Sequence, residues 1–156
     1  MNILFATVLL PLLGVVALLF VRSDNNLRIK QVSLLFASLS FLCSLLLWLN
    51  FDNNTTSFQF YHRFTWLLNF SNNNIDFIIG IDGISLFFIL LTTFLFWLCL
   101  LSTWNNVHHL LKEHAIAFLI MEAMLLIVFS VLDLLLFYVF FESVLIPMFL
   151  LIGVWG

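Results

Sequence analysis

Residues 115–155 read AIAFLIMEAMLLIVFSVLDLLLFYVFFESVLIPMFLLIGVW, which is the longest apolar stretch of the chain. A transmembrane helix needs about 20 predominantly apolar residues to cross a bilayer, so this stretch is too long for one span and right for two. Asp133 stands near its middle and marks the expected reversal of direction. The stretch therefore predicts two antiparallel transmembrane helices, at residues 115–132 and 134–152.

Three earlier apolar runs, at residues 2–21, 32–49 and 84–101, have the length and composition of further spans. The first run has no basic residues before it and no small-residue cleavage site after it, so we interpret it as a retained span rather than a signal peptide. Of the 156 residues, 64% are hydrophobic and only 8% are charged, whereas soluble domains carry about 25% charged residues. We therefore expect an all-α membrane protein with five transmembrane helices, forming a single transmembrane domain over residues 1–156.

The one long polar stretch, residues 50–82, is expected to be an extramembrane loop between the second and third spans. Its residue pattern is compatible with a short hairpin and with a segment lying at the membrane interface, and periodicity does not choose between them. Asp82 stands just before the third span, where a carboxylate complements the positive end of the helix dipole.

The distribution of basic residues predicts the orientation of the chain. With five spans, the loops after the first and third spans share a side, and these loops carry Arg22, Arg28, Lys30 and Lys112. The opposite side carries Arg63. The positive-inside rule then places the N-terminus outside and the C-terminus inside.

The sequence argues against most kinds of chemistry within this chain. A net charge of −3 gives no basic surface for nucleic acid. We find no nucleophile motif, phosphate-binding loop, cysteine cluster or haem-ligand pair, and we expect no cofactor, metal or catalytic residue here. His108, His109 and His114 are interpreted as solvated loop residues.

Two glutamates, Glu122 and Glu142, interrupt the apolar pattern in the middle of the fourth and fifth spans. An ionised carboxylate at the bilayer centre costs about 2.5–3.5 kcal/mol on insertion scales. Each glutamate therefore either stays protonated and hydrogen-bonds a neighbouring helix, which is a structural role, or carries protons. Intramembrane carboxylates favour the second interpretation.

Three further residues make the surroundings of Glu142 polar. Pro147 has no N–H, so it leaves the carbonyl of Ser143 without its helical partner. Tyr138 lies one helical turn before Glu142, on the same face. Glu122 and Glu142 lie at similar distances from Asp133, so they are expected at similar depths, although the sequence does not show whether they face each other.

These motifs resemble subunit 4 of NADH–ubiquinone oxidoreductase, respiratory complex I, in its N-terminal part. The resemblance rests on residues 132–149 (LDLLLFYVFFESVLIPMF), residues 80–88 (GIDGISLFF) and residues 153–156 (GVWG). The family is related to subunits of cation/proton antiporters. The resemblance implies that Glu142 belongs to a proton-translocating machinery and lies near a lysine of a later helix, with a weaker implication for Glu122.

Members of that family carry many more helices than the five expected here. The resemblance therefore implies a partner chain with the remaining helices, or a truncation, and other complex I membrane subunits as neighbours. It also implies that NADH, flavin, iron–sulfur clusters and ubiquinone bind in other subunits. The implied location is the mitochondrial inner membrane, as a multi-pass protein, with the bacterial plasma membrane as the less favoured alternative. Two alternatives stay open: a purely structural membrane subunit, and a subunit of a cation/proton antiporter.

Overall fold

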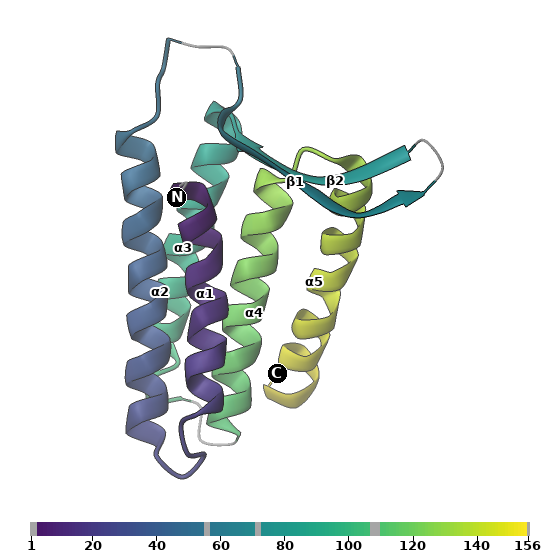
Figure 1. The fold of residues 1–156 in the computed structure, drawn as a ribbon. Coiled ribbons are helices and arrows are strands. Elements are labelled where there is room, and N and C mark those ends of the chain that lie inside the picture. Colours follow the sequence, from purple (N-terminus) through teal and green to yellow (C-terminus); the bar gives the residue numbers. More distant parts are fainter. Residues whose placement is uncertain (1–2, 55–56, 71–72, 107–109, 156) are drawn as a thin grey trace.

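The computed structural model describes residues 3–54, 57–70, 73–106 and 110–155, which form five helices and one two-stranded sheet (Figure 1). The elements are α1 (Ile3–Leu19), α2 (Asn26–Leu49), β1 (Gln59–Phe70), β2 (Asn73–Ile81), α3 (Gly83–Ser102), α4 (Leu111–Ser130) and α5 (Leu134–Trp155). Within the described residues, α2 to α5 are each long and apolar enough to cross a membrane, and α1 is apolar but shorter. The predicted fold class is thereby confirmed.

The start of α2 is the largest difference from the predicted spans. The helix begins at Asn26 rather than at residue 32, so Arg28 and Lys30 lie within its first turns. The side chain of Asn25 accepts a hydrogen bond from the Arg28 backbone N–H at 3.2 Å, which satisfies one of the free donors of the first turn. Hydropathy marks the part of a helix that fits the bilayer core, whereas the cap marks where the helix begins.

The boundary between α4 and α5 lies where the sequence predicts it. Residues 131–133 connect the two helices, and the Asp133 carboxylate accepts a hydrogen bond from the Leu135 N–H at 2.9 Å. A carboxylate in this position satisfies a free donor at the start of α5 and complements the helix dipole. The short connection makes α4 and α5 antiparallel neighbours, as Figure 1 shows.

Helices α1 to α4 pack into one bundle, and α5 packs chiefly against α4 at its edge (Figure 1). Gly14 of α1 lies at a close approach of three helices in the bundle. A Cβ atom at this position would lie 2.8 Å from Cβ of Phe36 in α2 and 3.0 Å from Cδ1 of Leu119 in α4. Glycine at position 14 therefore lets these three helices meet.

The loop alternatives that the sequence leaves open are decided in favour of a hairpin. Strands β1 and β2 pair antiparallel and cover one end of the bundle (Figure 1). Ile79 and Ile81 of β2 are buried in the same apolar cluster as Leu4 of α1 and Leu47 of α2. The backbone N–H of Leu132 donates to the carbonyl of Ile78 at 2.8 Å, which attaches the hairpin to the α4–α5 connection.

Asp82 caps the N-terminus of α3. Its carboxylate accepts a hydrogen bond from the Ser85 backbone N–H at 2.9 Å. This bond holds the pKa of the Asp82 carboxyl below its usual range. Because the pKa is lower in the folded state, the stabilisation is fully present above the unfolded pKa and is lost as the pH falls through the folded pKa.

We expect Asp82→Ala to destabilise the first turn of α3 by about 1 kcal/mol, because an N-cap side chain is lost. Amide hydrogen exchange of the backbone near Ser85 measures this as faster exchange at neutral pH. Asp82→Asn is the matched control: it keeps the accepting oxygen but cannot titrate, so exchange should remain slow and lose its acid-dependent acceleration. Unchanged exchange in Asp82→Ala would contradict the capping role.

The end of the bundle opposite the hairpin is formed by the end of α1, the start of α2 and the start of α4 (Figure 1). Arg28, Lys30 and Lys112 belong to these segments and Arg22 to the connection between α1 and α2, whereas Arg63 belongs to β1. Lys112 at the start of α4 donates from Nζ to the carbonyl of Val21 at 2.9 Å, so the start of α4 is linked to the segment that follows α1. Nζ of Lys30 lies 5.7 Å from the ring centroid of Trp104. Cations at this distance over an indole ring are attracted by its electron-rich face.

We predict that this basic end, together with the C-terminus, faces the inner side of the membrane, and that the N-terminus faces the outer side. A protease-sensitive tag at the N-terminus should be cleaved in right-side-out vesicles without permeabilisation, whereas the same tag at the C-terminus should be protected. Cleavage of the C-terminal tag alone would show that the chain has the opposite orientation.

Candidate functional site

The two membrane glutamates lie in opposite surroundings. Glu122 faces the interior of the bundle and is 0% exposed. Neither of its carboxylate oxygens has a hydrogen-bond partner within the described part of the chain. An ionised carboxylate without donors is costly in such a site, so the geometry favours the protonated, neutral form of Glu122.

Glu142, in contrast, lies on the exposed surface of α5. Tyr138, one turn earlier, is 61% exposed on the same face of the helix. A carboxyl and a phenol thus stand together on a surface that is otherwise formed by large apolar side chains, among them Phe141, Leu145 and Phe149. In a bilayer this pair requires a polar partner beyond the described helices.

The other two residues of the predicted polar face lie on a different side of α5. Ser143 and Pro147 line an apolar groove of about 370 Å³ between α4 and α5. The remaining lining residues are Glu113, Ile116, Ala117, Ile120, Met124, Ile146 and Leu150. The hydroxyl of Ser143 donates to the carbonyl of Val139 at 2.7 Å, so it is used within its own helix.

The structure therefore does not bring Glu122 and Glu142 together, although they belong to neighbouring helices. One carboxyl lies inside the α1–α4 bundle and the other lies on its outer edge. Two separate polar positions result: an enclosed one at Glu122, and an open one at Glu142 and Tyr138.

Buried hydroxyl groups between the helices of the bundle are a feature that the sequence analysis missed. The hydroxyls of Ser44 in α2 and Thr93 in α3 lie 2.8 Å apart. The hydroxyl of Ser40 donates to the carbonyl of Thr7 in α1 at 3.3 Å. A signal was present in the sequence, because small residues recur on one face of α2, at Ser33, Ala37, Ser40 and Ser44.

His114 corrects an expectation about the histidines. It was predicted to be a solvated loop residue, but it lies in α4 and is only 4% exposed. The helix begins four residues earlier than the predicted span, which turns His114 towards the rings of Phe118, at 4.7 Å, and Trp155, at 5.0 Å. His108 and His109 lie outside the described residues.

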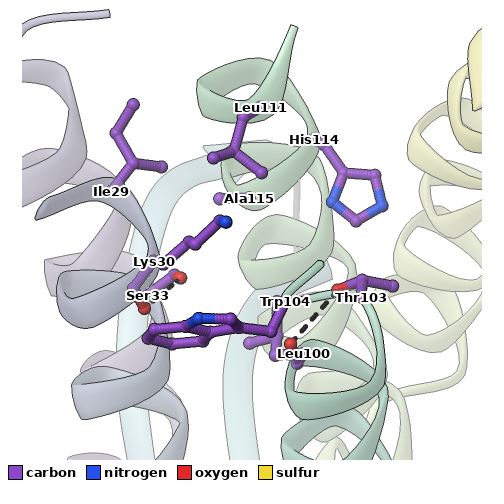
Figure 2. A pocket seen from close by; sticks show the side chains of 9 residues that line it. All are labelled: Ile29, Lys30, Ser33, Leu100, Thr103, Trp104, Leu111, His114 and Ala115. Atoms are coloured by element: carbon purple, nitrogen blue, oxygen red, sulfur yellow. Dashed lines mark hydrogen bonds between the residues drawn. The ribbon is translucent and has the colours of Figure 1, made fainter. Parts of the chain in front are cut away.

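Figure 2 shows the small pocket beside His114, at the basic end of the bundle. It has a volume of about 10 Å³, close to the least that holds one water molecule. Lys30, Ser33 and Thr103 contribute its polar lining. The hydroxyl of Ser33 donates to the carbonyl of Lys30, and the hydroxyl of Thr103 donates to the carbonyl of Leu100. Both hydroxyls thus donate to the backbone of their own segments.

Chemically, the two positions can bind and release protons. Each carboxyl exchanges one proton, and its neighbours are hydroxyl or phenol groups that donate and accept hydrogen bonds. An enclosed carboxyl responds strongly to nearby charges because the surrounding dielectric is low. The arrangement suits proton or cation movement across a membrane.

Comparison with known proteins identifies the relatives of this chain, although no protein-family model matches it. It is 51% identical over 94% of its length to NADH-ubiquinone oxidoreductase chain 4 of Prototheca wickerhamii. It is 52% identical over 99% of its length to the chain 4 of Chondrus crispus. The respiratory complex I structure from Thermus thermophilus contains a chain with a TM-score of 0.76 and 30% identity to the whole of this chain.

The chain spans about 30% of the length of these relatives. The matches confirm the resemblance predicted from the residue motifs, and the five-helix arrangement is similar to part of a chain in that complex I structure.

Proposed function

We propose that this chain forms the first five helices of a proton-translocating membrane-arm subunit of respiratory complex I. The observation that carries this proposal is the placement of Glu142 on the outward surface of an apolar membrane helix, beside Tyr138. A carboxyl in such a place needs a polar or charged partner, and further helices of a subunit similar to chain 4 would supply one.

Glu142 is proposed to change its charge during turnover. An opposite charge within about 4–6 Å favours the ionised form of a carboxyl, and withdrawal of that charge favours uptake of a proton. The resemblance implies that the opposite charge is a lysine of a later helix. Alternation between the paired and unpaired states would let Glu142 bind and release one proton in each cycle.

Glu122 is proposed as a second proton-carrying group, separate from the first. Its burial inside the α1–α4 bundle keeps it apart from the outward surface of α5. A proton on Glu122 would therefore exchange through the interior of the bundle, past the hydroxyls of Ser40 and Thr7.

The chemistry that drives the cycle is proposed to occur elsewhere in the assembly. NADH oxidation by flavin and iron–sulfur clusters, and reduction of ubiquinone, would take place in other subunits. The partners of this chain would be the neighbouring membrane-arm subunits and the remaining helices of its own subunit, carried by a second chain or by the rest of a longer one. Its location would be the mitochondrial inner membrane.

Depleting the chain from its native membranes tests this proposal. We expect NADH-driven proton translocation to fall to background in the depleted vesicles, while proton translocation driven by an electron donor that enters after complex I continues. NADH-driven translocation at its original rate would contradict the proposal. Loss of sodium/proton exchange alone would indicate an antiporter subunit, and an unchanged number of protons per NADH in the remaining activity would indicate a structural subunit.

A further inference from the structure

Helices α1, α2 and α4 meet in two successive layers. In the first layer, Gly14 lies against Phe36 and Leu119, at the distances given above. One turn further along each helix stand Pro11 in α1, Ser40 in α2 and Glu122 in α4. Residues three or four positions apart lie on the same helix face, so these side chains face the same interior as the first layer.

Pro11 creates a free acceptor in this second layer. It lies inside α1 and has no N–H, so the carbonyl of Thr7, four residues earlier, lacks its helical partner. The hydroxyl of Ser40 donates to this carbonyl across the helix interface. The oxygen–oxygen distance of 3.3 Å is long for a hydroxyl donor, which makes the bond weak and readily exchanged.

The carboxyl of Glu122 competes with the Thr7 carbonyl for the hydrogen of the Ser40 hydroxyl. The carboxyl is 0% exposed and has no hydrogen-bond partner within the described residues. The Ser40 hydroxyl lies near enough to interact with it, but its hydrogen is directed to Thr7. Within α1 to α4, the other fully buried polar side chains that are described carry hydroxyl groups. The buried imidazole of His114 lies eight residues before Glu122 in α4, about 12 Å away along the helix axis.

We propose that Glu122, Ser40 and the Thr7 carbonyl freed by Pro11 form a proton-holding site with two hydrogen-bond arrangements. In the protonated arrangement, the carboxyl O–H donates to Ser40, and Ser40 donates to Thr7. When the carboxyl releases its proton to water, Ser40 rotates and donates to the carboxylate, and the Thr7 carbonyl loses its partner.

This site deepens the proposed function and rests on the proposal that Glu122 carries a proton. Only one O–H bond breaks in the step, and the serine hydrogen stays on its own oxygen throughout. Pro11 matters because it provides the acceptor that holds the Ser40 hydrogen away from the carboxyl. A regular helix at position 11 would occupy the Thr7 carbonyl with its own N–H.

Infrared spectroscopy of the intact membrane assembly tests the site directly. The difference between the spectra of the wild type and of Glu122→Gln isolates the C=O band of the protonated Glu122. In Ser40→Ala this band should move to higher frequency, because the carboxyl loses its hydrogen-bond acceptor. In Pro11→Ala the band should move to lower frequency, because Ser40 is released from Thr7 and donates to the carboxyl oxygen.

Ser33→Ala is the matched control. Ser33 is also buried on the inner face of α2, but its hydroxyl donates to the carbonyl of Lys30, so the band should stay in place. If Ser40→Ala does not assemble, the shift of the band in Pro11→Ala tests the proposal. Alanine is a better helix former than proline, so this substitution leaves α1 intact.

The proposal is overturned if no protonated-carboxyl band disappears in Glu122→Gln. It is equally overturned if Pro11→Ala leaves the band in place, or if Ser33→Ala moves it as far as the other variants do. Because the readout is spectroscopic, failure of this site is distinct from failure of proton translocation, which is measured by pumping.

Discussion

Replacing Glu142 with glutamine is expected to reduce NADH-driven proton translocation to background while the membrane assembly still forms. Glutamine keeps the shape and most hydrogen bonds of glutamate, but it cannot ionise. The side chain is exposed on α5, so the substitution leaves the packing of the five helices unchanged. Proton uptake by vesicles, measured beside the yield of the assembled complex, separates loss of function from loss of assembly.

Two further variants complete this experiment. Glu142→Asp keeps the charge but shortens its reach, so part of the pumping should remain. Glu113→Gln is the matched control: it removes an exposed carboxyl at the start of α4 and should pump normally. Full pumping by an assembled Glu142→Gln complex would make Glu142 a structural residue.

Gly14→Ala is expected to have the largest effect on stability. The new Cβ would lie 2.8 Å from Cβ of Phe36, an atom fixed close to the backbone of α2, so the helices must separate. Overpacking of this kind costs about 1–3 kcal/mol. Thermal inactivation of the purified assembly should therefore occur at a lower temperature than in the wild type.

Gly153→Ala provides the control for this prediction. A Cβ at position 153 meets nothing within 4 Å in the described structure. The substitution has the same chemistry and also lies in a membrane helix, so the inactivation temperature should not fall. Equal decreases of the inactivation temperature in Gly14→Ala and Gly153→Ala would show that the close contact of α1, α2 and α4 does not cause the destabilisation.

The sequence predicts the number and order of the helices because the length of an apolar run has to match the thickness of the bilayer. It does not predict where α2 begins, since that depends on the Asn25 cap. It also leaves the hairpin open, because the strands are held partly by contacts with distant residues such as Leu132.

The two glutamates show the limit of prediction for the site. The sequence identifies both, because charged side chains are rare in apolar helices. It does not show that Glu122 faces inwards and Glu142 outwards, since α4 and α5 are apolar on all sides and have no polar face to fix their rotation. The hydrogen bond between Ser40 and Thr7, which the proposed Glu122 site uses, was missed because single hydroxyls are common in membrane helices.

The most direct test of the central claim is purification of the tagged chain from its native membranes in mild detergent. The chain should come with an assembly that oxidises NADH and reduces quinone, because the exposed Glu142 and Tyr138 need partner helices. A stable, monodisperse preparation of the chain alone, without this activity, would contradict the account.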